Sequence, residues 1–231
     1  MQATAKTSVE HTAIGRIVVP PNVPDGFRLF YTTIDFDGRI DDRIRDFVAP
    51  AELHSCHQIH GAESVRAGLN RLKPVLTPHE PACDALWSEL KTAALAIKVS
   101  DCLPVSIIDT RGVIANIHSG WRGAVQQIVA KTLDAAPLDP ASSIAYLGPS
   151  IRVCCFEVGE EVAAQFDAPF VDRHRGAKPH VDIAAFTAAV LRARGFEKIV
   201  DTELCTRCPE SIFHSYRRDK KSGRNLAIVA Q

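Results

Sequence analysis

The chain has 231 residues, of which 46% are hydrophobic and 23% charged, values typical of a globular protein with a sizeable core. The 27 basic residues balance the 27 acidic ones, so the formal net charge is zero and no basic excess points to nucleic acid or an anionic membrane. No apolar run approaches the ~20 residues of a membrane helix. We therefore expect one domain over residues 1–231.

The seven cysteines are an odd number for a chain of this size. No apolar stretch near the N-terminus has the pattern of a secretory signal. This combination predicts a cytoplasmic protein whose cysteines are free thiols.

The N-terminal third of the chain predicts short elements. Residues 1–15 are polar and indicate a loose tail or an edge strand. Residues 28–33 (RLFYTT) are typical of a strand. The charge-rich residues 35–46 predict a short helix or an exposed loop. Residues 65–75 are amphipathic without a decisive period, and residues 77–81 predict a loop.

Two apolar runs near the middle of the chain, residues 99–108 and 113–118, predict strands because Val and Ile dominate them. The intervening Asp-Thr-Arg-Gly is a turn signal. The expected hairpin sets Ile108 against Val113 and Leu103 against His118.

At the open end of this hairpin, Cys102 and His118 come within reach across the strands. Strict alternation in the expected register, however, points Cys102 to the opposite face from His118. A bend or bulge at Pro104 would reconcile the two.

The next segment predicts one helix across residues 125–136, because its apolar residues recur at i, i+3 and i+4. Its N-terminus would lie beside His118, Ser119 and Arg122. Free N–H groups there would favour an anionic group of a substrate.

The remaining chain alternates between strands and helices, which predicts a mixed α/β class. Asp182 is the expected N-cap of a helix that ends before Gly195. The apolar face of this helix is expected to be Ile183, Phe186, Val190 and Ala193. Further strands are expected at 143–148, 199–202 and 225–230, and a short helix at 158–166.

A thiolate and an imidazole at one strand end have two main chemical uses. Cys102 and His118 could be a nucleophile with its base, or two ligands of a metal ion. Either His57 or His60 of HQIH could supply a third ligand, and spacing leaves both open. Three protein ligands with an open position are the catalytic zinc pattern, although copper tolerates the same donors.

Other polar motifs are less specific. Cys205 and Cys208 form a lone CxxC, and a zinc ribbon needs a second pair, so we expect these two and the adjacent Cys154 and Cys155 to be structural or loop thiols. Residues 216–219 (YRRD) could bind phosphate or form a solvated charge cluster. Dinucleotide, P-loop, serine-hydrolase and zincin motifs do not occur.

Four segments in this order, VSDCLPV, HSGWRG, YLGPSIRVCCFEVGEEV and FHSYRRDKKSGR, resemble the laccase-domain family. Its members are also called multicopper polyphenol oxidases, peptidoglycan editing factors, or purine nucleoside phosphorylases with adenosine deaminase activity. The resemblance runs from Gln58 to the C-terminus and implies a layered α/β/β/α fold with mixed sheets. It implies His60, Cys102 and His118 as metal ligands, with zinc bound and copper in some relatives.

The resemblance also implies phosphorolysis of adenosine, inosine, guanosine or methylthioadenosine, and deamination of adenosine. A purine nucleoside and phosphate would then be the partners, with Arg122, Ser119 and the helix N-terminus after Gly123 receiving the phosphate. Asp84 would support the site or carry a proton, or would be a structural turn carboxylate.

One segment departs from the family. Relatives carry T-x-R-x-G-G, whose Arg helps to hold the substrate, where this chain has TTIDFDG with Ile34 at the Arg position. Two alternatives therefore stay open: a metal-free hydrolase with Cys102 as nucleophile and His118 as base, and a non-catalytic or editing protein of peptidoglycan metabolism. The expected assembly is a monomer or a small homo-oligomer.

Overall fold

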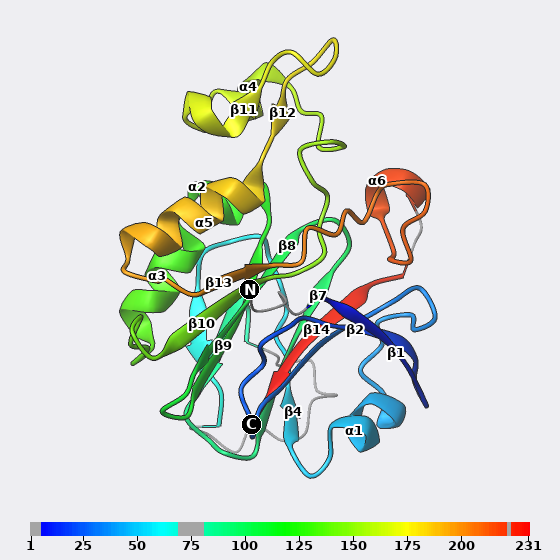
Figure 1. Ribbon diagram of the computed structural model, residues 1–231, viewed down its shortest axis with the longest axis vertical. Helices are drawn as coiled ribbons and strands as arrows, with labels where there is room; N and C mark the ends of the chain where they lie inside the picture. Colours follow the sequence, from blue (N-terminus) through cyan, green and yellow to red (C-terminus); the bar gives the residue numbers. More distant parts are fainter. Residues whose placement is uncertain (1–5, 69–80, 221–222) are drawn as a thin grey trace, which may run out of the picture.

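The computed structural model describes residues 6–68, 81–220 and 223–231 (Figure 1). Parts of three predicted segments, the N-terminal tail, the amphipathic stretch 65–75 and the loop 77–81, lie outside these residues. Within the described residues, no helix has the length and apolar character needed to cross a membrane.

The strands form two six-stranded sheets and a two-stranded ribbon. The first sheet has the order β1-β2-β3-β14-β7-β4, with β1 (Ser8–Thr12), β2 (Gly15–Val19), β3 (Arg28–Thr32), β4 (Glu52–His54), β7 (Ala93–Val99) and β14 (Asn225–Ala230). The second has the order β13-β10-β8-β9-β6-β5, with β5 (Ser64–Arg66), β6 (Ala85–Ser88), β8 (Leu103–Asp109), β9 (Val113–Ser119), β10 (Ser143–Leu147) and β13 (Ile199–Asp201). The ribbon pairs β11 (Val171–Asp172) with β12 (His180–Val181).

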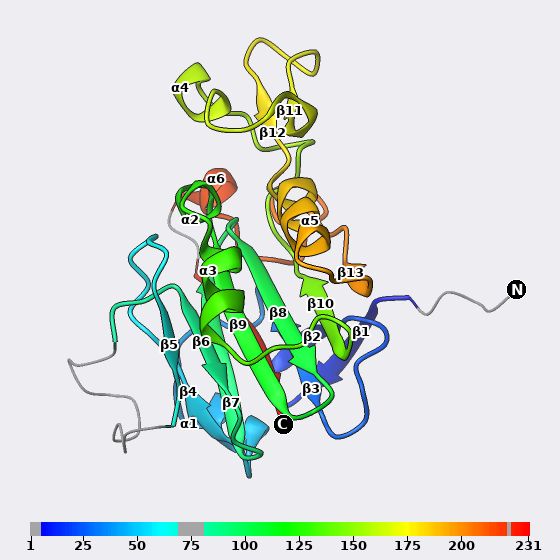
Figure 2. The same ribbon diagram turned by 90° about the vertical axis from the view of Figure 1, so that its left-hand side faces the viewer.

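The described helices are short. They are α1 (Asp42–Val48), α2 (Trp121–Val125), α3 (Ile128–Ala135), α4 (Glu160–Ala163), α5 (Ile183–Ala193), α6 (Tyr216–Asp219) and the 3-10 helix η1 (Ala168–Phe170). Figure 2 shows α3 and α5 lying over the second sheet, while α4 and the ribbon project beyond it.

Three clusters of buried apolar side chains separate four layers. The first cluster lies between the two sheets and includes Leu95 and Ile114. The second lies between the second sheet and α3 with α5, and the third between the first sheet and α1. Both sheets contain parallel and antiparallel pairs. The predicted layered α/β/β/α fold with mixed sheets is therefore confirmed.

The central hairpin forms, but its predicted register is wrong by one residue. Asp109 pairs with Val113 across a three-residue loop, in which Gly112 has φ +105°. A glycine at the third loop position closes a three-residue hairpin, whereas the prediction assumed four loop residues. Pro104 therefore lies opposite His118, and Leu103 opposite Ser119.

This shift removes the expected conflict between Cys102 and His118. Because side chains alternate along a strand, a shift of one residue moves each of them to the other face. Pro104 is the partner of His118, and Cys102 lies two residues before Pro104. Alternation along the strand therefore places Cys102 on the same face as His118, and no bulge is needed. The run predicted as one strand over residues 99–108 is instead split, since β7 ends at Val99 and β8 begins at Leu103.

The predicted helix over residues 125–136 is also wrong as a single element. Only α3 lies within this range, α2 ends at Val125, and Gln127 between the two helices has a left-handed φ of 64°. A residue in this conformation cannot continue a right-handed helix.

The later elements follow the prediction closely. Asp182 caps α5 by accepting a hydrogen bond from the Ala185 N–H, and Gly195 follows the helix with φ +88°. Ala193 is exposed, so its place on the predicted apolar face is wrong, and Leu191 is buried instead. The N-terminal tail includes the edge strand β1, and residues 42–48 of the charge-rich region form α1.

A buried amide joins the two sheets. Asn116 of β9 donates hydrogen bonds to the carbonyls of Leu95 in β7 and Ala227 in β14, both at 2.8 Å. Its Oδ1 accepts from the Ser106 hydroxyl at 3.0 Å. Every polar group of this side chain is thus satisfied inside an apolar layer, as a stable buried network requires.

Candidate functional site

Three side chains that are far apart in the sequence meet at one end of the second sheet. The candidate ligand atoms of His60, Cys102 and His118 all lie within 4.8 Å of one another. His118 is buried on β9, Cys102 is half-buried just before β8, and His60 is exposed on the loop after β4. The two imidazole rings meet edge to face, with centroids 4.8 Å apart.

The loop of HQIHG is held by Gln58. Its side-chain amide donates to the backbone carbonyl of Lys98 and accepts from the N–H of the same residue, both at 2.8 Å. Two residues later, His60 has a left-handed φ of 59°. His57, by contrast, is part of a bridge with Ala82 and does not belong to the ligand group.

Asp84 positions both His118 and the loop that carries His60. Its Oδ1 lies 2.7 Å from Nδ1 of His118, and its two oxygens accept hydrogen bonds from the backbone N–H groups of Ile59, His60 and Gly61 at 2.7 to 3.2 Å. The carboxylate is fully buried. A carboxylate bound to one imidazole nitrogen fixes the ring so that the other nitrogen can serve as a ligand.

Cys102 follows a residue in an unusual backbone conformation. Asp101 has φ 86°, and its carboxylate accepts hydrogen bonds from Thr206 Oγ1 and from the Arg217 N–H, both at 2.7 Å. Its carbonyl accepts from the Ile151 N–H at 2.8 Å. Contacts from two distant loops and from α6 therefore support a strained residue next to Cys102.

The local electrostatics favour a charged pair. Burial opposes ionisation of Cys102, but hydrogen bonds and charge from His118 and His60 outweigh it and lower the pKa of the thiol to about 6. Burial also lowers the pKa of His118, but Asp84 and Cys102 outweigh it and raise that pKa to about 9. Both shifts favour a thiolate on Cys102 beside a protonated His118.

These donors suit a metal ion. Two imidazole nitrogens and one thiolate sulfur are typical ligands of zinc and are tolerated by copper. Gly120 has no side chain, which leaves space beside two of these ligand residues. A Cβ at this position would lie 3.0 Å from Cys102 Sγ and 3.6 Å from His60 Cδ2. His60, Cys102 and His118 could therefore hold an ion.

A pocket of about 60 Å³ opens beside Cys102. Its walls include the aromatic side chains of Trp121 and Phe156, which also line a more open hollow of about 320 Å³. Lys178 and Arg217 lie in the larger hollow. The small pocket beside Cys102 and the larger hollow therefore share two aromatic side chains.

The structure treats the two predicted phosphate-binding residues differently. Ser119 lines the pocket, and its buried hydroxyl has no hydrogen-bond partner among the described residues. Arg122 is exposed and stacks over Trp121 at 4.4 Å from the ring centroid. Because α2 has only five residues, the anion site expected from a longer helix dipole has little support.

Two positioning residues were missed by the sequence analysis. Gln58 is part of the HQIHG motif and Asp101 of VSDCLPV, so the resemblance already contained the signal for both. Their roles depend on backbone contacts with Lys98 and Ile151, which the sequence does not reveal.

Residues 41–231 match the family described as multi-copper polyphenol oxidoreductase laccase. The chain belongs to this family.

Relatives with assigned names support the same relationship. The chain is 31% identical over 222 residues to adenosine deaminase RL5 of an unknown prokaryotic organism, covering 89% of this chain and 82% of that protein. It is 34% identical over 193 residues to a purine nucleoside phosphorylase of Xylella fastidiosa, covering 78% and 72%.

Solved structures have the same fold. Neisseria meningitidis protein NMB0706 superposes with a TM-score of 0.80 at 24% identity, covering 93% of this chain and 98% of that one. YlmD from Geobacillus stearothermophilus has a TM-score of 0.81 at 21% identity, covering 96% and 98%.

Proposed function

We propose that this chain is a zinc-dependent purine nucleoside phosphorylase that also deaminates adenosine. Adenosine, inosine, guanosine and methylthioadenosine form its proposed substrate class. The observation that carries the proposal is the meeting of His60, Cys102 and His118 beside a pocket, in a chain whose relatives carry these two enzyme names.

Zinc is the proposed ion, and copper is the alternative occupant. Three protein ligands with a free fourth position are typical of catalytic rather than structural zinc. When bound, the ion supplies Lewis-acid chemistry at that free position.

The protein's own residues set the geometry. Asp84 accepts a hydrogen bond from the Nδ1–H of His118 and thereby leaves Nε2 as the ligand atom. Because the Asp84 oxygens already receive hydrogen bonds from His118 and three backbone N–H groups, we assign it a positioning role rather than that of a proton shuttle.

Groups that line the small pocket and the larger hollow support the proposed substrates. Trp121 and Phe156 offer aromatic surfaces for a purine base. Ser119 offers a buried hydroxyl without a partner among the described residues. Lys178 and Arg217 supply positive charge in the larger hollow for phosphate, while Arg122 lies exposed beside Trp121.

A nucleoside panel tests this function. Protein supplied with zinc is incubated with each nucleoside, with and without phosphate, and the products are separated by chromatography. We expect phosphate-dependent release of the free base, and inosine from adenosine. The His118→Ala variant should lose both activities and about one zinc per chain. The proposal would be contradicted if the wild-type protein formed neither the free base nor inosine.

The hydrogen bonds that connect Asp84 to His118 and His118 to Cys102 favour a second candidate. It is a metal-free hydrolase with Cys102 as nucleophile and His118 as base. Alkylation with iodoacetamide separates the two. A hydrolase of this kind would keep full activity in chelator and lose it when Cys102 is alkylated. The metal enzyme would lose activity in chelator and recover it when zinc is restored.

A further inference from the structure

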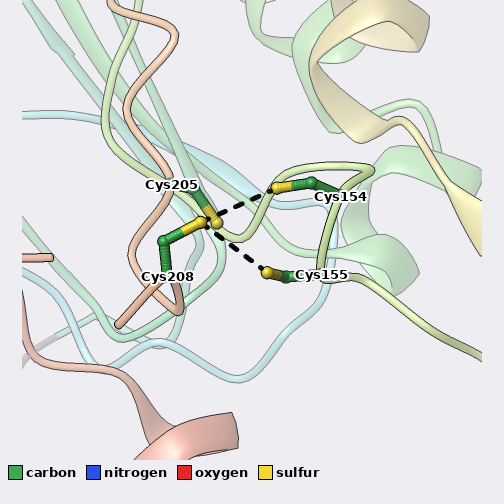
Figure 3. Close-up of side chains that lie close together, drawn as sticks. All are labelled: Cys154, Cys155, Cys205 and Cys208. Carbon is green, nitrogen blue, oxygen red and sulfur yellow. Dashed lines mark hydrogen bonds between the residues drawn. The ribbon is translucent and has the colours of Figure 1, made fainter. Parts of the chain in front are cut away.

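Four cysteines outside the candidate site meet in space. Cys154 and Cys155 lie in the turn after β10, and Cys205 and Cys208 lie in the loop after β13 (Figure 3). Their sulfur atoms all lie within 4.8 Å of one another. The four cysteines thus lie in loops, as expected, but the structure also brings the adjacent pair Cys154–Cys155 next to the CxxC pair Cys205–Cys208, which the sequence spacing did not reveal.

We propose that these four cysteines hold a structural Zn²⁺ ion. A tetrahedral zinc site with Zn–S bonds of about 2.3 Å places its sulfur atoms roughly 3.8 Å apart. The Sγ atom of Cys208 lies 3.9 Å from that of Cys154 and 3.8 Å from that of Cys155. Two of the six sulfur separations thus match the edges of the tetrahedron, and the other four are within 4.8 Å.

The donor set identifies the class of ion. Four thiolates form a soft, closed coordination shell, which favours zinc over magnesium or calcium and leaves no position for water or substrate. The site therefore differs in kind from His60–Cys102–His118, and it shares no residue with that group.

The surroundings suit a surface site that forms when the two loops come together. Cys154 is exposed and the other three cysteines are half-buried. Backbone hydrogen bonds already bring the loops together, from the Ser150 N–H to the Leu204 carbonyl and from the Thr206 N–H to the Ser150 carbonyl. An ion at the cysteines would cross-link residues separated by 53 and 54 positions in the chain.

The two loops that carry the four cysteines also contact the candidate active site. Ile151, three residues before Cys154, donates to the carbonyl of Asp101, and Thr206 donates to its carboxylate. Phe156, the residue after Cys155, lines the pocket beside Cys102. The proposed ion would therefore hold one wall of the pocket, whatever reaction occurs there.

The test uses full-length protein in which the first site has been removed by His60→Ala and His118→Ala. This variant is purified under reducing conditions with added zinc, and its metal content is measured by mass spectrometry. We expect about one zinc per chain, released by a thiol-blocking mercurial. Adding Cys154→Ser or Cys208→Ser should reduce the zinc content to near zero. Cys102→Ser, added instead, is the matched control and should leave it unchanged.

A spectroscopic readout leaves all four cysteines intact and so does not depend on how these substitutions fold. Cobalt bound to the variant without the first site should give the intense visible bands of a tetrahedral ion and the strong sulfur-to-metal absorption of several thiolates. A cobalt spectrum without thiolate absorption would overturn the proposal. So would zinc-free protein, or a Cys154–Cys208 or Cys155–Cys208 disulfide found by mass spectrometry in the reduced, zinc-supplemented sample.

Discussion

Asp84 is hydrogen-bonded to two separate segments of the candidate site. It binds the ring of His118 and the backbone of the loop that carries His60. Replacing it with Asn keeps the shape but removes the charge and puts an N–H₂ donor where one oxygen accepts. We expect Asp84→Asn to weaken zinc binding at the first site by about 10- to 100-fold, which competitive titration with a chelating dye would measure.

Asp109 provides the matched control for this substitution. It is also fully buried, accepts from backbone N–H groups of Arg111 and Asp139, and lies at the opposite end of the hairpin. Asp109→Asn should lower the free energy of unfolding without changing zinc affinity. Equal losses of affinity in the two variants would show that Asp84 acts only through stability.

The charged pair at Cys102 and His118 predicts how zinc binding depends on pH. His118 has a raised pKa of about 9, so below that pH a proton competes with the metal. Cys102 has a lowered pKa of about 6, so below that pH a second proton competes. Zinc affinity should therefore rise with pH up to about 9, and most steeply below about 6.

Calorimetry in buffers of different ionisation enthalpy measures the protons released. The Cys208→Ser variant is used so that the first site is titrated alone. We expect this pair to release about one proton per zinc near pH 7.5 and about two near pH 5. Zero release from the pair at the higher pH would mean that His118 is already neutral there.

At the scale of elements, the break between α2 and α3 is a stability cost that one substitution can test. Gln127 is exposed and has a φ of 64°, where a side chain costs roughly 1 kcal/mol relative to glycine. Gln127→Gly should raise the free energy of unfolding by about this amount in denaturant titrations.

Gln126 is the natural control because it is the same residue type, is also exposed, and has an ordinary φ of −79°. Gln126→Gly should lower the free energy of unfolding by roughly 0.5–1 kcal/mol, since glycine is more flexible in the unfolded chain. Changes of the same sign in both variants would contradict the assignment of strain to Gln127.

The same elements show where sequence patterns stop being sufficient. Val and Ile content predicted β9 well, and Asp182 with Gly195 predicted both ends of α5, because these signals are local. The hairpin register depended on whether its loop has three or four residues, and a DTRG turn is compatible with both. That single residue decided whether Cys102 and His118 share a face.

Long-range contacts explain the other differences. Apolar spacing is the same for one helix or two, so it could not reveal the left-handed Gln127. Spacing could not choose between His57 and His60 either; the family resemblance did. Cys154 and Cys155 approach Cys205 and Cys208 only because β10 and β13 are neighbours in the second sheet.

At the scale of the whole molecule, apolar packing joins the two sheets, and the side chain of Asn116 adds hydrogen bonds between them. Its amide connects β9 of the second sheet to β7 and β14 of the first. Asn116→Ala would remove these bonds, leave the Ser106 hydroxyl without this acceptor and open a small cavity between the sheets. We expect it to lower the free energy of unfolding by about 2–4 kcal/mol in denaturant titrations.

Ser106→Ala separates the inter-sheet bonds from the bond within the second sheet. This variant removes the hydrogen bond to Oδ1 of Asn116 and keeps both bonds from Asn116 to the first sheet, so its cost should be about 1 kcal/mol. The larger cost of Asn116→Ala would then measure what the two bonds to Leu95 and Ala227 contribute to holding the sheets together. Equal costs for the two variants would mean that the two hydrogen bonds from Asn116 to the first sheet contribute nothing to its attachment to the second sheet.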